Sequence, residues 1–173
     1  LDHDVVLLSG GVSAGRLDLV PAQLEAAGVT QVFHKVHVKP GKPIWFGVSA
    51  SRSETGSPCF VFGLPGNPVS SMVCFELFVR TALRRLSGQL ESQPEAITAR
   101  LATAHRSVGD RPTYFPCRYA QDGGSTIATP VSWQGSSDLR STVDANAMIL
   151  FPAGDCDFQE GDSVEVFRWA GSE

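Results

Sequence analysis

The sequence lacks the features of a membrane or secreted protein. No apolar run in its 173 residues approaches the roughly 20 residues that a helix needs to cross a bilayer. The first residues have neither the basic start nor the apolar middle of a signal peptide. We therefore expect a cytoplasmic protein that does not bind a membrane. Since the sequence opens on Leu1 with a strand expected almost at once, we also expect it to be part of a longer protein.

Paired cysteines and broad positive charge are also missing. The four cysteines are widely spaced and include no CxxC pair, which indicates buried thiols in a reducing compartment. The net charge of −4 argues against nucleic-acid binding, because such binding requires a broad basic surface. Any anion site must therefore be local. The 42% of hydrophobic and 18% of charged residues are typical of a folded protein, and the length suits two small domains.

The first half of the chain has the pattern of an α/β domain. A buried strand at 5–8 leads into the glycine loop Ser9-Gly-Gly-Val-Ser-Ala-Gly15. A helix should follow, with Asp18 as its cap and Gly28 as its stop. Further strands are predicted at 32–38, 43–48 and 59–62.

A second glycine loop, Gly63-Leu-Pro-Gly-Asn-Pro68, follows the last of these strands. Asn67 is a good helix cap and Pro68 a good first helical residue, because proline lacks the amide hydrogen that would be unpaired there. A long helix should run from this loop to Gly88. We assign residues 1–88 to one domain and 89–95 to a linker.

Short strands separated by turn residues fill the rest of the chain, and we assign residues 96–173 to a second, all-β domain. Asp122-Gly-Gly is a strong hairpin signal. No helix is needed here, so we expect a small antiparallel barrel or sandwich. The predicted strands are 96–104, 113–120, 125–132, 146–152 and 163–169.

Both glycine loops would follow a strand and open a helix, an arrangement that directs backbone amides at an anion. If their strands are parallel and adjacent, the two loops lie together at the carboxyl ends of the sheet, where α/β proteins bind ligands. The alternative is that the glycines serve only the geometry of the turns.

The segment Lys35-Val-His-Val-Lys39 alternates polar and apolar residues. On a strand, Lys35, His37 and Lys39 would share one face, with the two lysines roughly 13 Å apart by strand rise. They would suit two groups of an extended anion, or they protect an edge strand from aggregation. His34 and His37 would face opposite sides, which disfavours a metal site.

A serine nucleophile is a further alternative. Gly11-Val-Ser-Ala-Gly15 fits the pattern of a nucleophile elbow and its strand–loop–helix context. A triad also needs an acid and a histidine downstream, and no downstream histidine has a clear loop setting. We therefore disfavour a hydrolase.

Three motifs, taken in order, resemble one family. They are Ser9–Gly15 with Asp18, Lys35-Val-His-Val-Lys-Pro-Gly-Lys-Pro43, and Phe62-Gly-Leu-Pro-Gly-Asn-Pro-Val-Ser70. The chain resembles the carboxy-terminal portion of the molybdopterin molybdenumtransferases, which include bacterial MoeA and the E domain of gephyrin. The resemblance implies part of a MogA-like α/β molybdopterin-binding domain, followed by a small all-β barrel-like domain.

The resemblance also implies a reaction and its residues. In this family adenylylated molybdopterin and molybdate are the substrates, Mg²⁺ helps to cleave the adenylyl bond, AMP is released, and molybdenum stays on the dithiolene. Asp18, Lys35 and Lys39 match catalytic positions, and Asp18 also matches a Mg²⁺ ligand. The positions that match substrate-binding residues are Ser9, Gly10, Gly11, Ser13, Gly15, Lys42, Gly63, Pro65, Gly66, Asn67, Ser70, Arg118 and Ser136.

The chain departs from the family's full pattern at its start. Family members begin with two further domains and with a first part of the α/β domain that carries additional acidic groups. We therefore expect the strand at 5–8 to lack its usual neighbours and the chain alone not to catalyse. The family's homodimer is expected only in the longer protein.

Three other functions stay open. One is a molybdopterin adenylyltransferase, which shares the first glycine loop but not the β domain after Pro94. Another is a pterin-binding or scaffolding module, because gephyrin relatives also anchor receptors. The last is a phosphate-binding domain without chemistry.

Overall fold

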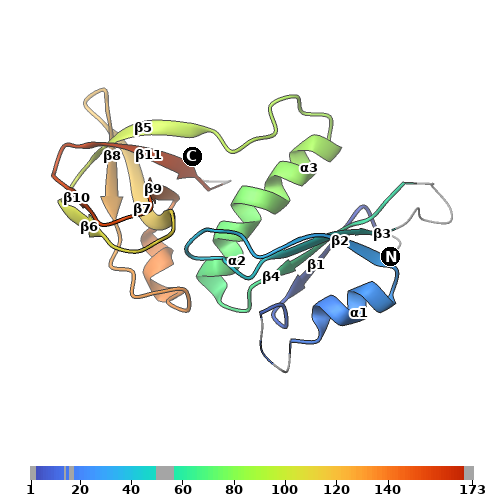
Figure 1. The fold of residues 1–173 in the computed structure, drawn as a ribbon. Coiled ribbons are helices and arrows are strands. Elements are labelled where there is room, and N and C mark those ends of the chain that lie inside the picture. The colour runs from blue at the N-terminus through green and yellow to red at the C-terminus, as the bar shows by residue number, and fades with distance from the viewer. Residues whose placement is uncertain (1–2, 14, 16–17, 50–56, 170–173) are drawn as a thin grey trace. The chain divides into compact units, whose positions relative to one another are not determined.

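The computed structural model describes residues 3–13, 15, 18–49 and 57–169. The chain forms two compact units (Figure 1). The first unit comprises Leu1–Val36 and Gly41–Glu91, and the second comprises His37–Pro40 and Ser92–Glu173. No helix among the described residues is long and apolar enough to cross a membrane.

The first unit contains a four-stranded sheet in the order β1-β4-β3-β2. Its outer strand β1 runs parallel to β4, and the other neighbours are antiparallel. The strands predicted at 5–8, 43–48 and 59–62 are confirmed with small shifts at their ends. The observed bounds are β1 Val5–Ser9, β2 Val29–His34, β3 Trp45–Ser49 and β4 Phe60–Leu64.

The strand predicted at 32–38 is wrong in its second half. β2 ends at His34, and Lys35 adopts a left-handed conformation with φ of 69°, which breaks the period of two. Lys35, His37 and Lys39 therefore do not share a strand face. His37–Pro40 belongs to the second unit, where the amide of Lys39 donates to the carbonyl of Pro112 at 2.9 Å.

The helix after the first glycine loop, α1 (Val20–Ala26), is confirmed, and Gly28 follows it with φ of 82°. The predicted cap is wrong: Leu19 occupies the cap position, and no side chain caps the helix. Helix α1 covers one face of the sheet (Figure 1). Val20 and Leu24 pack there against a buried cluster that includes Trp45.

The long helix predicted after the second loop is confirmed. It begins at Pro68 with Asn67 at the cap position, and the positive φ of Gly88 follows its end. Its segments are α2 (Pro68–Cys74), a π-helical stretch (Phe75–Val79) and α3 (Arg80–Leu86). This helix packs on the other face of the sheet against an aromatic-rich cluster. The sheet that carries the glycine loops is therefore covered by helices on both faces.

The second unit is a closed five-stranded barrel in the order β11-β5-β8-β7-β9. Its strands are labelled in Figure 1. Of the two predicted architectures it is the barrel, but β5 and β8 pair in parallel, so the barrel is not wholly antiparallel. Asp122 does form a hairpin with Ser125. The strands are β5 Ala96–Leu101, β7 Thr113–Asp122, β8 Ser125–Pro130, β9 Ala147–Phe151 and β11 Ser163–Arg168.

Three small elements of the second unit were not predicted. Strands β6 (His105–Ser107) and β10 (Cys156–Phe158) pair as a separate two-stranded sheet. A 3-10 helix, η2, spans Arg140–Asp144 and precedes β9. Each element is five residues or fewer, which is too short to give a clear periodic signal.

Candidate functional site

The two glycine loops meet at the carboxyl ends of β1 and β4. The amide of Gly10 donates to the carbonyl of Leu64 at 2.9 Å. A Cβ atom placed on Gly66 would lie 3.5 Å from the Cα of Gly10, so the two backbones are in van der Waals contact. The expectation that the two strands are parallel and adjacent is confirmed. The junction of the two loops therefore lies at the edge of the sheet where α/β proteins usually bind ligands.

The first loop is anchored in the core of its unit by the side chain of Val12, which is 1% exposed. Its carbonyl accepts a hydrogen bond of 2.8 Å from His34 Nε2. Because a carbonyl only accepts, Nε2 carries the proton. Gly11 has φ of 69° and leaves no room for a Cβ, which would lie 2.8 Å from Val20. Valine, histidine and glycine together fix the path of the loop.

Asp18 stabilises the far end of the first loop. Its Oδ2 accepts a hydrogen bond of 2.6 Å from the amide of Gly15, so this acid closes a turn instead of capping α1. Ser9 and Ser13 are both exposed on the same loop. Ala14, Arg16 and Leu17 lie outside the described residues.

The second loop has a buried base and an exposed tip. Gly63 and Pro65 are buried, whereas Gly66 and Asn67 are exposed. The Ser71 hydroxyl donates to the Pro65 carbonyl and ties the loop to the helix that follows. Ser70, predicted to bind substrate, is only 4% exposed. The exposed tip is therefore the part of this loop that a ligand can reach directly.

The three predicted lysines are divided between the units. Lys35 and Lys42 are exposed in the first unit, where the Lys35 amide donates to Ile44 at 2.8 Å and the Lys42 carbonyl accepts from Val36 at 2.9 Å. Lys39 is exposed in the second unit. Because the predicted strand ends before Lys35, the strand-based separation of roughly 13 Å does not apply.

In the second unit, Arg118 is exposed on β7 opposite Thr129. Ser136 is half-buried in the segment between β8 and η2. Nearby Asp138 accepts backbone hydrogen bonds from Gln134 at 3.0 Å and from Ser141 at 3.2 Å. The bond from Gln134 is the main cause that holds the pKa of Asp138 below its ordinary value.

The sequence did not single out Asp138 or the contact of His34 with Val12. The spacing Asp138-Leu-Arg-Ser141 is a recognisable signal for the first, because an aspartate often accepts from an amide three residues later. No local signal predicts the second, because it joins the end of β2 to the first glycine loop, 22 residues away in the sequence.

Histidine and cysteine form no metal centre among the described residues, in which no group of three candidate ligands occurs. His37 Nε2 donates to the Asp110 carbonyl at 2.9 Å, and His34 is engaged with Val12 in the other unit. The pairing of His34 with a carbonyl also argues against its acting as a base for Ser13. Burial raises the pKa of the Cys74 and Cys117 thiols to about 12.

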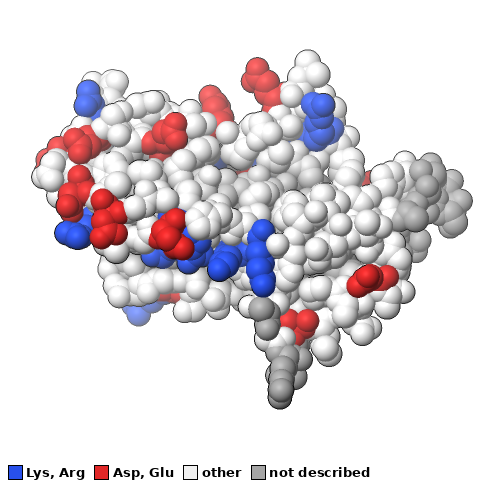
Figure 2. Space-filling model, in the orientation of Figure 1, with Lys and Arg blue, Asp and Glu red and all other residues white. Residues whose placement is uncertain are grey.

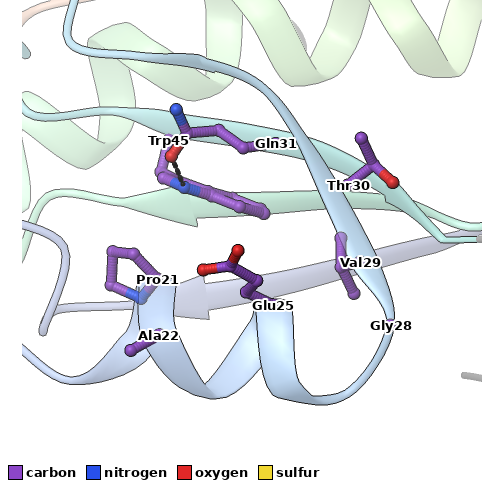
Figure 3. A pocket seen from close by; sticks show the side chains of 8 residues that line it. All are labelled: Pro21, Ala22, Glu25, Gly28, Val29, Thr30, Gln31 and Trp45. Carbon is purple, nitrogen blue, oxygen red and sulfur yellow. Dashed lines mark hydrogen bonds between the residues drawn. The ribbon is translucent and has the colours of Figure 1, made fainter.

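A hollow of about 640 Å³ lies between α1 and the antiparallel strands of the first unit (Figure 3). Trp45 Nε1 donates to Gln31 Oε1 at 2.8 Å on one wall, and Glu25 projects from α1 toward it. Glu25 is the charged residue of the lining, and its carboxylate would repel a phosphate. The lining residues are Pro21, Ala22, Glu25, Gly28, Val29, Thr30, Gln31 and Trp45. We do not assign the anion site to this hollow.

Charge on the surface is mixed. On the face drawn in Figure 2, acidic and basic side chains both occur, with large uncharged areas between them. This agrees with a charged fraction of 18% and a net charge of −4.

Two families of known domains match the chain in succession. Residues 1–85 match a family described as a probable molybdopterin binding domain. Residues 98–169 match a family described as the MoeA C-terminal region, domain IV. The first match lies mainly in the first unit and the second match lies in the second unit; residues 37–40, which belong to the second unit, fall within the first match.

Curated relatives match over nearly the whole chain. A molybdopterin molybdenumtransferase from Synechocystis is 31% identical over 170 residues, which is 98% of this chain and 39% of the relative. Another from Bacillus subtilis is 32% identical over 165 residues, which is 94% of this chain and 36% of the relative. The chain therefore spans well under half the length of these relatives.

A solved structure has the same fold. The molybdopterin biosynthesis MoeA protein from Pyrococcus horikosii superposes with a TM-score of 0.74 at 31% identity, over 98% of this chain and 38% of that protein. The similarity extends over both units of this chain.

Proposed function

We infer that the chain belongs to the molybdopterin molybdenumtransferase family, because its two halves match in succession a probable molybdopterin binding domain and the MoeA C-terminal region. From this premise we propose that it takes part in inserting molybdate into adenylylated molybdopterin, with release of AMP. The observation that carries the proposal is the junction of the two glycine loops at the ends of β1 and β4, held by the bond from Gly10 to Leu64.

Some residues of the two loops fix the shape of the backbone, and others are exposed to contact the substrate. The amides of Gly10 and Gly15 already donate within the protein, to Leu64 and Asp18 respectively, so these glycines shape the first loop. Contacts with the phosphates of the pterin substrate then fall to the exposed Ser9 and Ser13 and to the exposed tip of the second loop. Hydroxyls and backbone amides are common phosphate ligands in such loops.

Lysine and arginine supply the positive charge. Lys35 and Lys42 in the first unit neutralise phosphate oxygens, since ammonium groups bind phosphate as point charges. In the second unit Arg118 and Ser136 bind the molybdate oxyanion, because arginine offers a planar set of donors and serine adds a hydroxyl. Lys39 is assigned to the same anionic substrates.

Asp18 fits the role of a Mg²⁺ ligand. Its Oδ2 is held by the Gly15 amide, which orients the carboxylate. Mg²⁺ is commonly bound by one or two carboxylates together with substrate phosphates and water, so Asp18 would supply one of its ligands. When bound, the ion would neutralise charge on the phosphates. Asp18 itself keeps the end of the loop closed.

The proposal is tested with a chimera in which this chain replaces the matching segment of the Synechocystis relative. With adenylylated molybdopterin, molybdate and Mg²⁺, we expect the chimera to release AMP. The chain alone is expected not to do so, because it spans 39% of that relative. A folded chimera that neither binds adenylylated molybdopterin in calorimetry nor releases AMP would contradict the proposal.

A first site variant of the chimera is Lys35→Ala, compared with the unsubstituted chimera. We expect this variant to weaken substrate binding by roughly 10- to 100-fold, since a charged hydrogen bond to phosphate contributes on the order of 1.5–3 kcal/mol. An unchanged affinity would remove Lys35 from the proposed site while leaving the rest of it in place.

A further inference from the structure

The segment that carries Ser136 is organised around one carboxylate, that of Asp138. Oδ2 accepts from the amide of Gln134 at 3.0 Å, and Oδ1 accepts from the amide of Ser141 at 3.2 Å. The amide of Asp138 itself donates to the carbonyl of Gly135 at 2.9 Å. The two bonds that link Asp138 to Gln134 and Gly135 span Ser136, and the third ties Asp138 to the start of η2.

One end of this segment packs on the barrel, and the other end is a short helical turn with a buried threonine. On one side the Trp133 ring packs edge-on against Phe115, with 5.1 Å between the ring centres. On the other side Thr142 of η2 is 6% exposed and donates through its hydroxyl to the Leu139 carbonyl. The stretch from Gln134 to Ser137 lies between these anchors, and Gly135 within it has φ of 138°. Its shape therefore depends on the bonds to Asp138.

A carboxylate is the side chain suited to this task. The two amides donate to different oxygens, so both bonds need two acceptors on one side chain. Asparagine offers one acceptor oxygen and alanine offers none. An ionised acceptor also makes stronger bonds with amides than a neutral one. Arg140, two residues away, adds favourable charge.

We propose that Asp138 is a positioning residue that holds Ser136 in place for an oxyanion. The proposal rests on the function proposed above, in which Ser136 binds molybdate. Asp138 does not touch the anion in this scheme; it acts through the backbone of residues 134–137. Substitution at Asp138 should then weaken anion binding only to the extent that Ser136 contributes to it.

The first measurement is molybdate affinity of the chimera described above, by calorimetry, for Ser136→Ala, Asp138→Ala, Asp138→Asn and the double variant S136A/D138A. We expect each alanine variant to bind about tenfold more weakly, in the range found for supporting residues around an ion site. Asn should be intermediate. The double variant should bind no more weakly than Ser136→Ala, because residues that act through one another are not additive. The matched control is Asp144→Ala, which removes an exposed acid of η2.

The second measurement is amide hydrogen exchange in the 173-residue chain, which needs no ligand. We expect Asp138→Ala to speed exchange at Gln134 and Ser141, whereas Asp144→Ala leaves it unchanged. Melting curves identify any variant that fails to fold, and Asp138→Asn then supplies the comparison.

The outcomes separate the two proposals. Additive losses in the double variant, wild-type affinity in Asp138→Ala, or unchanged exchange would overturn the positioning role. If instead the parent chimera binds no molybdate, or Ser136→Ala has no effect, the proposed function of Ser136 fails. Faster exchange in Asp138→Ala would then leave Asp138 a structural residue only.

Discussion

The amide of Gly10 donates to the carbonyl of Leu64, and this bond of 2.9 Å joins two loops that are far apart in the sequence. Directly beneath it, Gly63 faces the buried side chain of Val12. The two loops are thus seated on one another and on the core. A change in the packing under either loop should be felt by both.

Gly63→Ala should destabilise the first unit. The added Cβ would lie 2.6 Å from Val12 Cγ1 and 3.3 Å from Trp45 Cβ, both in the core. Overpacking of this kind costs about 1–3 kcal/mol of unfolding free energy, measurable in urea. The matched variant is Gly66→Ala, whose Cβ makes only an ordinary contact at 3.5 Å. A stability for Gly63→Ala equal to that of Gly66→Ala would contradict the packing described.

Lys35→Gly should show whether the side-chain charge of Lys35 contributes to substrate binding, with little change in the stability of the first unit. Lys35 has φ of 69°, a conformation that costs a residue with a Cβ about 1–2 kcal/mol. Glycine relieves this strain but gains entropy in the unfolded chain, so we expect the unfolding free energy to change by less than about 1 kcal/mol. The affinity of the chimera for adenylylated molybdopterin should fall, because the charge is lost. Lys35→Arg keeps the charge and should keep the affinity; equal affinity for Gly and Arg would argue against a role for the charge.

His105 should make the second unit less stable in mild acid. Burial lowers its pKa from the ordinary 6.5, and the ring stacks on Phe151 with 4.3 Å between centres. In the unfolded chain the imidazole takes up a proton near pH 6.5, whereas in the folded chain it does so only at lower pH. The unfolded state therefore binds more protons than the folded state in this window. The contribution of His105 to the stability of the folded chain is complete above pH 6.5 and declines as the pH falls toward the lowered pKa.

The measurement is the unfolding free energy of the wild type and of His105→Phe across this pH range. Phenylalanine can stack on Phe151 but does not titrate. We expect the difference between the two chains to shift in favour of His105→Phe as the pH drops. A difference that is independent of pH would show that His105 titrates alike in both states.

The cysteines should differ sharply in reactivity. Cys74 and Cys117 are fully buried, and burial raises the pKa of each thiol to about 12, so neither forms a thiolate at pH 8. Cys59 is also fully buried, whereas Cys156 is half-buried. Iodoacetamide at pH 8 should label Cys156 first, and all four thiols only after unfolding. Early labelling of Cys74 or Cys117, read by mass spectrometry, would contradict the burial described.

The loops of the first unit were predictable because their signals are local. The end of β4 and the start of the long helix are marked by neighbouring residues: a buried strand, two glycines, and then Asn67 and Pro68. The hairpin at Asp122 is of the same kind. Whether β1 and β4 are neighbours is not a local property, but parallel strands with ligand loops at one edge are common enough to make it a sound expectation.

The path after His34 was not predictable from the same signals. Val36 and Val38 continue the alternation of a strand, yet the chain leaves the sheet at Lys35. What replaces the strand is long-range: the Lys39 carbonyl accepts from the Tyr114 amide at 2.7 Å, and Lys39 forms a bridge with Thr113. No residue near Lys39 in the sequence announces that partner. Asp18 looked like a helix cap for a different reason: its carboxylate does accept from a nearby amide, but that amide belongs to Gly15, which precedes it, and not to α1.

The route of the chain between the two units limits where the protein can be cut into separate domains. The backbone enters the second unit at His37, returns at Gly41, and enters again at Ser92. The four residues of the first visit contribute a bridge and two backbone bonds to the barrel unit. Cloning, proteolysis or recombination at Glu91 would therefore release a barrel without that short segment and leave its coding sequence inside the other unit. An exchange of the whole second unit between two such proteins therefore has to include residues 37–40 as well as the stretch from Ser92 onward.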